Sequence, residues 1–121
     1  MSAPEELSDL FQQWQLLTEE ESGAITAGAW DQVEHYQSAK ARLQPRITEV
    51  SRRLDPTDLE QRFRSVINDL MEMERRNDAL IQEKRQEAKE QENTLDRTQR
   101  NLRQIQKSYI PPSRTHWQSY S

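Results

Sequence analysis

Few residues of this 121-residue chain have the types and spacing that catalysis or metal binding requires. Asp31 and His35 are four residues apart, so both would lie on one face of a helix, but two ligands do not make a metal site. The Glu-x-x-His pattern of di-iron helical bundles is absent, because Gln32 stands three residues before His35. The second histidine, His116, lies far away near the end of the chain. The sequence therefore predicts no metal-binding residues.

The other common catalytic motifs are also missing. The chain has no cysteine, which excludes thiolate zinc sites, cysteine nucleophiles and disulfides. It has two glycines and no glycine-rich phosphate loop, and no serine is paired with a plausible base. We expect a protein that is not an enzyme, with no catalytic or cofactor-binding residues and no cofactor.

Charge is distributed unevenly along the chain. The first 35 residues contain eight acids and neither lysine nor arginine, whereas residues 97–121 contain five bases and no acid. Arg97, Arg100, Arg103 and Lys107 recur every three or four residues, so they would share a helical face able to follow phosphates. However, the net charge of the chain is −4 and few side chains are available to stack on bases. We expect no nucleic-acid partner; these bases either flank an apolar stripe or stabilise a helix C-terminus.

The composition leaves two structural classes, disorder or long solvated helices. Charged residues make up 31% of the chain, and Leu, Ile, Val and Phe together make up about 18%, below the roughly 20% under which disorder becomes an option. No apolar run approaches the roughly 20 residues of a membrane span, and the start of the chain has no secretory signal pattern. We therefore expect a cytoplasmic protein with no membrane span.

Apolar residues recur at intervals of three and four through most of the chain, which is typical of amphipathic helices. A capping box begins at Ser2 and another at Thr57, and Gly28 suits the left-handed position that ends a helix. Pro45 lies inside the second apolar pattern and is expected to kink that helix or to split it near Leu43. The predicted helices are residues 4–27, 30–54 and 57–110.

The third predicted helix is too long for the other two to cover. It would reach roughly 75–80 Å, against about 35 Å for each of the others, so the first two can cover it only as far as Ile81. We predict an all-α fold, an antiparallel three-helix bundle or coiled coil with the C-terminal part of the third helix projecting beyond it. Residues 1–110 would form a single domain, followed by a Pro/aromatic tail over 111–121. The alternative is a break near Ala88 that folds the third helix back as a fourth.

An apolar stripe without an intrachain partner is the main functional feature of this pattern. After a charged stretch over 82–94, apolar residues return at the spacing of a helical face, and the tail adds aromatic side chains whose burial is favourable. The tail either covers this stripe until a partner displaces it or is disordered. The candidate partner-binding residues are Leu95, Leu102, Ile105, Tyr109 and Trp117.

Two polar residues occupy positions where the apolar pattern predicts a hydrophobic side chain. They are Lys40 and Asn77. In coiled coils such residues fix the register at some cost in stability. Lys40 would meet Glu20 or Glu21 across the first two helices, or lie in solvent at the edge of the seam.

The residues around the first turn resemble a known family. Glu19-Glu20-Glu21, then residues 24–34, and then Lys40 and Leu43 resemble the first hairpin of flagellar export chaperones of the FlgN and FliT type. That hairpin has an acidic residue, a small-residue turn, a short amphipathic stretch and a Lys-x-x-Leu. Residues 73–81 are similar to the Asn-x-x-Leu stretch of the long third helix in that class. The resemblance extends over about residues 7–110, with Ala29 where the family often has Asp.

The resemblance implies a cytoplasmic chaperone of the flagellar type III export system. Such proteins hold hook-associated or cap subunits by their amphipathic terminal helices and bring them to the export apparatus. An unpartnered helical stripe that accepts a client helix is consistent with this role. The alternative is a structural coiled-coil protein that homodimerises through its C-terminal arm.

Overall fold

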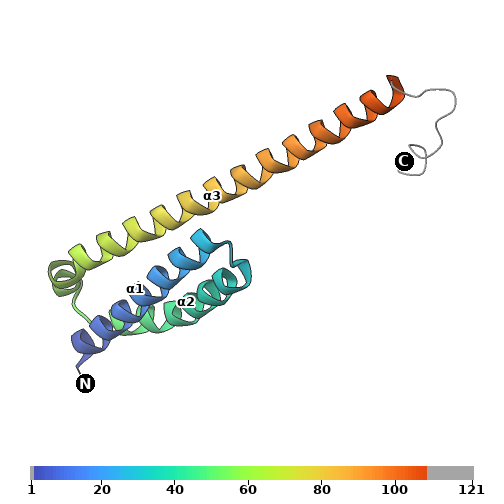
Figure 1. Ribbon diagram of the computed structural model, residues 1–121. Coiled ribbons are helices and arrows are strands. Elements are labelled where there is room, and N and C mark those ends of the chain that lie inside the picture. The colour runs from blue at the N-terminus through green and yellow to red at the C-terminus, as the bar shows by residue number, and fades with distance from the viewer. Residues whose placement is uncertain (1, 109–121) are drawn as a thin grey trace. The chain divides into compact units, whose positions relative to one another are not determined.

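The computed structural model describes residues 2–108, which form three helices and contain no strand. The helices are α1 (Ala3–Ala27), α2 (Trp30–Ser51) and α3 (Pro56–Ser108) (Figure 1). The predicted all-α fold is confirmed. No helix within the described range has both the length and the hydropathy of a membrane-spanning segment.

The chain divides into two units between Lys84 and Arg85. The first unit contains α1, α2 and the beginning of α3. The described part of the second unit, residues 85–108, consists of the remainder of α3. α3 is assigned as one helix across this boundary, without the predicted alternative of a break near Ala88.

The ends of α1 follow the capping signals in the sequence. The Ser2 hydroxyl accepts a hydrogen bond from the Glu5 backbone N–H at 3.4 Å, and a proline lies in the first turn. At the other end, Gly28 adopts φ 70°, the left-handed conformation that glycine favours. The Gly28 and Ala29 N–H groups donate to the Ile25 and Ala24 carbonyls, which closes α1 in a Schellman arrangement. These bonds turn the chain directly into α2.

The connection between α2 and α3 differs from the prediction. α2 ends at Ser51 rather than near 54, because the N–H groups of Arg53 and Leu54 bond to carbonyls three residues back in tight turns. α3 starts at Pro56 rather than at Thr57, with the Asp55 carbonyl accepting the Leu59 N–H at 2.9 Å. Proline suits a first helical position, because it has no N–H and the backbone N–H of any other residue there would have no intrahelical partner.

Of the two effects expected of Pro45, a kink of the helix or a split near Leu43, the split does not occur. The helix continues through this residue to Ser51. A proline in a helix removes one backbone hydrogen bond and crowds the carbonyl four residues earlier. Pro45 and Ala41 are both exposed, so that carbonyl lies at the surface of the helix, where water can bond to it.

Two apolar clusters form the core of the first unit. The larger cluster joins all three helices and includes an edge contact between the rings of Phe11 and Phe63, whose centroids are 5.5 Å apart. The smaller cluster lies beside the α1–α2 turn, where Leu80 and Ile81 of α3 pack against it. The buried members of the larger cluster are Leu7, Leu10, Phe11, Val50, Phe63 and Leu70, and those of the smaller are Ala24, Ile25 and Val33.

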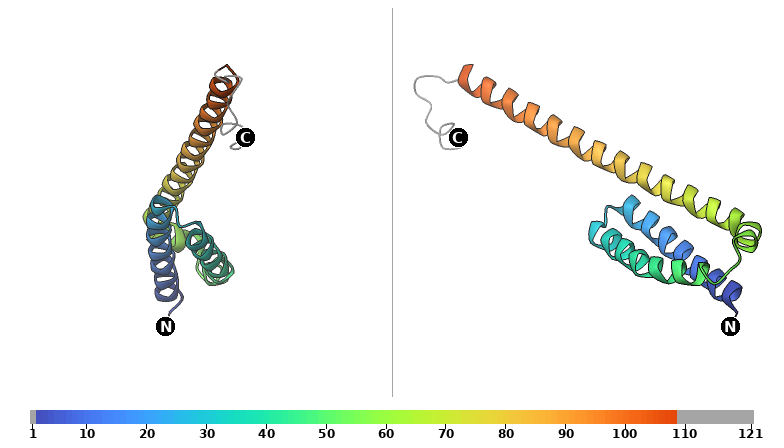
Figure 2. Two further views of the ribbon diagram at one scale, coloured as in Figure 1. Left: turned by 45° about the vertical axis from the view of Figure 1, so that its right-hand side comes forward. Right: turned by 180° about the vertical axis from the view of Figure 1, so that it is seen from behind.

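The contacts between helices show how they are paired. Along α1, Glu6 contacts Arg46 and Arg53, whereas Glu21 contacts Lys40, so the order of contacts on α2 is reversed. Figures 1 and 2 show α1 and α2 side by side. Towards α3 the order is conserved, because Phe11 meets Phe63 and the later Glu21 meets Asn77.

A surface pair on α3 has a consequence for titration. Glu72 accepts hydrogen bonds from the Arg75 guanidinium, which holds the pKa of the Glu72 carboxyl below its ordinary value. A lowered pKa in the folded state contributes stability above the pKa of the unfolded chain, and that contribution is lost as the pH falls through the folded value. We expect carbon-detected NMR to place the Glu72 midpoint below that of exposed glutamates in the same chain. In Arg75→Gln the midpoint should rise; an unchanged midpoint would exclude Arg75 as the cause.

Candidate partner-binding site

A layer of polar side chains separates the two apolar clusters of the first unit. On each helix the polar positions lie in sequence between residues of the larger cluster and residues of the smaller one. Four of these side chains are buried although they carry polar or charged groups. We call this group the polar layer; its members are Trp14, Thr18, Glu21, Lys40, Glu74 and Asn77.

Lys40 is the central cation of the polar layer. Its Nζ lies 3.0 Å from Glu21 Oε1 and 2.6 Å from Glu74 Oε1, and 5.4 Å from the centre of the Trp14 ring. Asn77 Nδ2 donates to Glu21 Oε1 at 2.8 Å and to the Thr18 carbonyl at 3.0 Å. The buried charges are thus paired and hydrogen-bonded, as burial demands. One ammonium group connects all three helices.

Glu74 receives several donors on a single oxygen. Its Oε1 accepts hydrogen bonds from Trp14 Nε1 at 3.0 Å and from Lys40 Nζ. The Thr18 hydroxyl lies 3.1 Å from the same oxygen and donates its hydrogen to the Trp14 carbonyl. The Glu74 side chain is 36% exposed, whereas that of Glu21 is 2% exposed. Two carboxylates and one ammonium give these three ionisable groups a formal charge of −1.

The prediction for Lys40 is confirmed in one of its two forms. Lys40 is buried and pairs with Glu21, one of the two acids expected, rather than lying in solvent. The other acid, Glu20, interacts with Tyr36 instead. Burial is the main cause that raises the pKa of the Tyr36 phenol, and the charge and hydrogen bond of Glu20 raise it further. Asn77, the second polar residue singled out in the sequence, belongs to the same layer.

The apolar stripe of the second unit lies on an exposed stretch of helix. Every residue from Arg85 to Ile105 is exposed. Leu95, Leu102 and Ile105 are 58%, 60% and 58% exposed, although leucine and isoleucine are normally among the most buried residues. Their spacing of seven and three residues puts the three side chains on one face of α3. We keep the name apolar stripe for these three residues.

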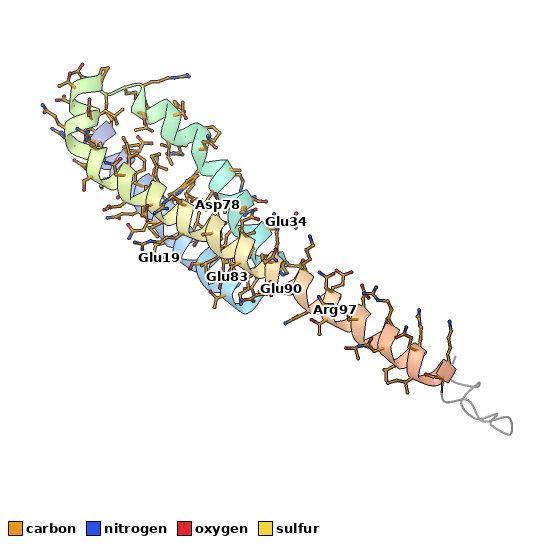
Figure 3. The ribbon with its side chains drawn as sticks, turned by 90° about the horizontal axis from the view of Figure 1, so that it is seen from above. Glu19, Glu34, Asp78, Glu83, Glu90 and Arg97 are labelled. Carbon is orange, nitrogen blue, oxygen red and sulfur yellow. The ribbon has the colours of Figure 1, made fainter. Side chains whose placement is uncertain are left out.

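The four bases that follow the start of this stripe are centred on the opposite side of the helix and extend to the edges of the stripe. Each residue advances about 100° around the axis, so Arg100 is about 140° from Leu95 and about 160° from Leu102. Arg97, Arg103 and Lys107 cluster around Arg100 by the same geometry. Arg103 is about 80° from Leu95 and Arg97 about 80° from Ile105, so these two bases border the stripe at its edges, as the interpretation of flanking bases expects. Figure 3 shows Arg97 on this stretch of α3.

The structure brings together some of the predicted site residues. Leu95, Leu102 and Ile105 share one exposed face, whereas Tyr109 and Trp117 lie outside the described residues. Trp14, Thr18 and Glu74 of the polar layer were not singled out in the sequence. Glu74 lies next to Glu72, Arg75 and Arg76 in the sequence, so the pattern suggests a run of charged residues exposed to solvent. One feature of the sequence could have pointed to Glu74: a lysine on an apolar helix face needs an anionic partner on a neighbouring helix.

Comparison with known proteins gives no family for this chain. No protein-family model matches it, and no curated protein or solved structure matches it at a significant level. Across residues 2–108, no three acidic or histidine side chains are grouped so that they could hold a metal ion. The features available for a functional proposal are therefore the exposed apolar stripe and the first unit with its polar layer.

Proposed function

We propose that this chain is a non-enzymatic chaperone of flagellar type III export, acting in the cytoplasm. It would hold a hook-associated or cap subunit by an amphipathic terminal helix and bring it to the export apparatus. The observation that carries the proposal is the apolar stripe: three large aliphatic side chains, each more than half exposed, on one face of a helix. Such a face can pair with the apolar face of a client helix.

The arrangement of the first unit adds support. The resemblance to the FlgN and FliT type depends on Lys40 with Leu43 and on Asn77 with Leu80. Lys40 and Asn77 both donate to Glu21, itself within the acidic triplet of that pattern. The small-residue turn of the pattern is the connection at which Gly28 ends α1. Residues scattered in the sequence motif thus have a common structural role in this chain.

The proposal is tested by capture of a client with two forms of the chain. The full chain and a form ending at Thr94 are immobilised and exposed to host lysate, and bound proteins are identified by mass spectrometry. We expect the full chain to retain a hook-associated or cap subunit, and the shortened form to lose it. The shortened form keeps both apolar clusters and the polar layer, so it should remain folded.

The client itself provides the control for this experiment. A captured subunit lacking its terminal helices should no longer bind the full chain. Capture that persists after truncation of the chain, or without the terminal helices of the subunit, would contradict the proposed mode of binding. The absence of any flagellar subunit among the captured proteins would contradict the function.

The alternative is a structural coiled coil in which two copies pair through the same stripe. The seven-residue interval from Leu95 to Leu102, followed by Ile105 three residues later, is the spacing of a coiled-coil seam. This alternative predicts a molar mass in light scattering that rises towards a dimer with concentration. Deletion of residues 95–121 should abolish the increase. A monomer at all concentrations would exclude it.

A further inference from the structure

The first unit contains a second apolar surface, at the junction of its three helices. A pocket of about 250 Å³ opens between them, below the roughly 300–1,000 Å³ of typical small-molecule sites. Its size and apolar walls suit aliphatic side chains better than a cofactor. Its apolar walls are formed by Phe11 and Trp14 of α1, Ile47 of α2, and Ile67 and Met71 of α3.

Met71 gives this pocket an adaptable rim. Its side chain is 65% exposed, the largest exposed fraction among the large hydrophobic residues described. Methionine is flexible and polarisable, so it can adjust its conformation to side chains of different shape. Phe11, by contrast, is buried in the larger apolar cluster and supplies a fixed wall. The pocket therefore combines a rigid base with a movable edge.

Glu74 lines the same pocket and determines the charge of its occupant. The Trp14 indole and the Lys40 ammonium donate to Glu74 Oε1 and the Thr18 hydroxyl lies 3.1 Å from it, whereas Oε2 accepts none of the hydrogen bonds found among residues 2–108. Together with Glu21 and Lys40, this carboxylate leaves a formal charge of −1 beside the pocket. A purely apolar cover would remove this charge from water without a partner, which is costly. An acidic or phosphate-bearing ligand would be repelled.

We propose that this pocket binds a partner helix that carries a large aliphatic residue and, one turn away, a lysine or arginine. The aliphatic side chain enters between Ile47, Ile67 and Met71, and the cation pairs with Glu74 Oε2. Residues three or four apart lie on the same helical face, so one helix can present both groups. This site lies in the first unit and is independent of the apolar stripe and of the proposed export function.

Synthetic helices of opposite charge test the proposal on the full chain. The probe is an acetylated, amidated alanine-glutamine helix with two leucines in consecutive turns and one arginine in the next. The matched probe has glutamate in place of that arginine. Binding is followed by NMR through the Met71 methyl group and the indole N–H of Trp14, which donates to Glu74.

We expect the arginine probe to shift both signals and to bind about tenfold more tightly than the glutamate probe. Glu74→Gln should bring the two probes to similar affinities, because the amide keeps an acceptor for Lys40 but loses the charge. Met71→Ser, at an exposed position, should weaken both probes and leave the fold intact. Leu102→Asp, on the apolar stripe, should change neither affinity.

Three results would overturn the proposal. The first is equal affinity of the two probes for the unmodified chain, and the second is the absence of any shift at Met71. The third is a shift of the Met71 signal with protein concentration alone, without probe. That result would make a second copy of this chain the occupant of the pocket.

Discussion

Replacement of Lys40 by methionine should lower the free energy of unfolding by about 3–5 kcal/mol, the usual cost of leaving one member of a buried ion pair without its partner. Glu21, whose side chain is 2% exposed, would retain only the Asn77 amide as a donor among residues 2–108. Glu74 would keep Trp14 and Thr18 and could turn towards water. Urea denaturation followed by far-UV circular dichroism measures the change directly.

Two further variants make this result specific. Arg46→Met breaks a surface pair with Glu6 in which the arginine side chain is 64% exposed, and it should cost no more than about 1 kcal/mol. Adding Glu21→Gln to Lys40→Met should recover much of the loss, because no unpaired charge then remains buried in the core. If Lys40→Met were no more destabilising than Arg46→Met, the polar layer would not stabilise the fold as described.

The second large effect concerns binding by the apolar stripe. Leu102→Asp combined with Ile105→Asp should weaken client binding at least about 100-fold, because burial of each aliphatic side chain contributes about 1.5–3 kcal/mol. The free energy of unfolding should change by less than about 0.5 kcal/mol per site, since both side chains are more than half exposed in the folded chain. Calorimetric titration of the captured client against the variant gives the affinity.

A control for this variant adds the same charge away from the stripe. Asn93→Asp with Gln104→Asp introduces two aspartates in the same stretch of α3, each about 160–180° around the helix axis from Leu95 and Leu102. This control should bind the client nearly as well as the original chain. Equal weakening by both variants would indicate a general effect of charge, and no weakening by either would place the client contacts outside the stripe.

The sequence was sufficient to predict the three helices and the turn between α1 and α2. Apolar spacing defined the three segments, and Ser2 and Gly28 marked the ends of α1 because their capping roles depend only on neighbouring residues. The prediction of helix ends and interruptions failed where the same local sequence is compatible with two backbone conformations. Pro45 can split a helix or be tolerated on its surface, and the backbone around Arg53 can continue a helix or close in a turn.

The polar layer could be predicted only in part. Lys40 and Asn77 stood out because each interrupts an apolar seam, and a pairing of Lys40 with Glu20 or Glu21 was one of the two outcomes expected for it. Glu74 did not stand out, because its position opposite Lys40 depends on how far α3 is shifted along the other two helices. That shift is determined by side-chain packing among three helices. It cannot be derived from the periodicity of a single helix.

The exposed stretch of α3 has a consequence for the energetics of amide exchange. The early turns of α3 are held by core residues such as Phe63 and Leu70, whereas residues 85–105 are exposed throughout. Helix–coil cooperativity alone gives only marginal stability to a free segment of this length in water. Protection against hydrogen exchange should therefore decline along a single helix, from the value for global unfolding near Leu70 to that of local opening near Leu102. A ligand that covers the stripe would reduce this gradient, and part of its binding free energy would be consumed in ordering the backbone.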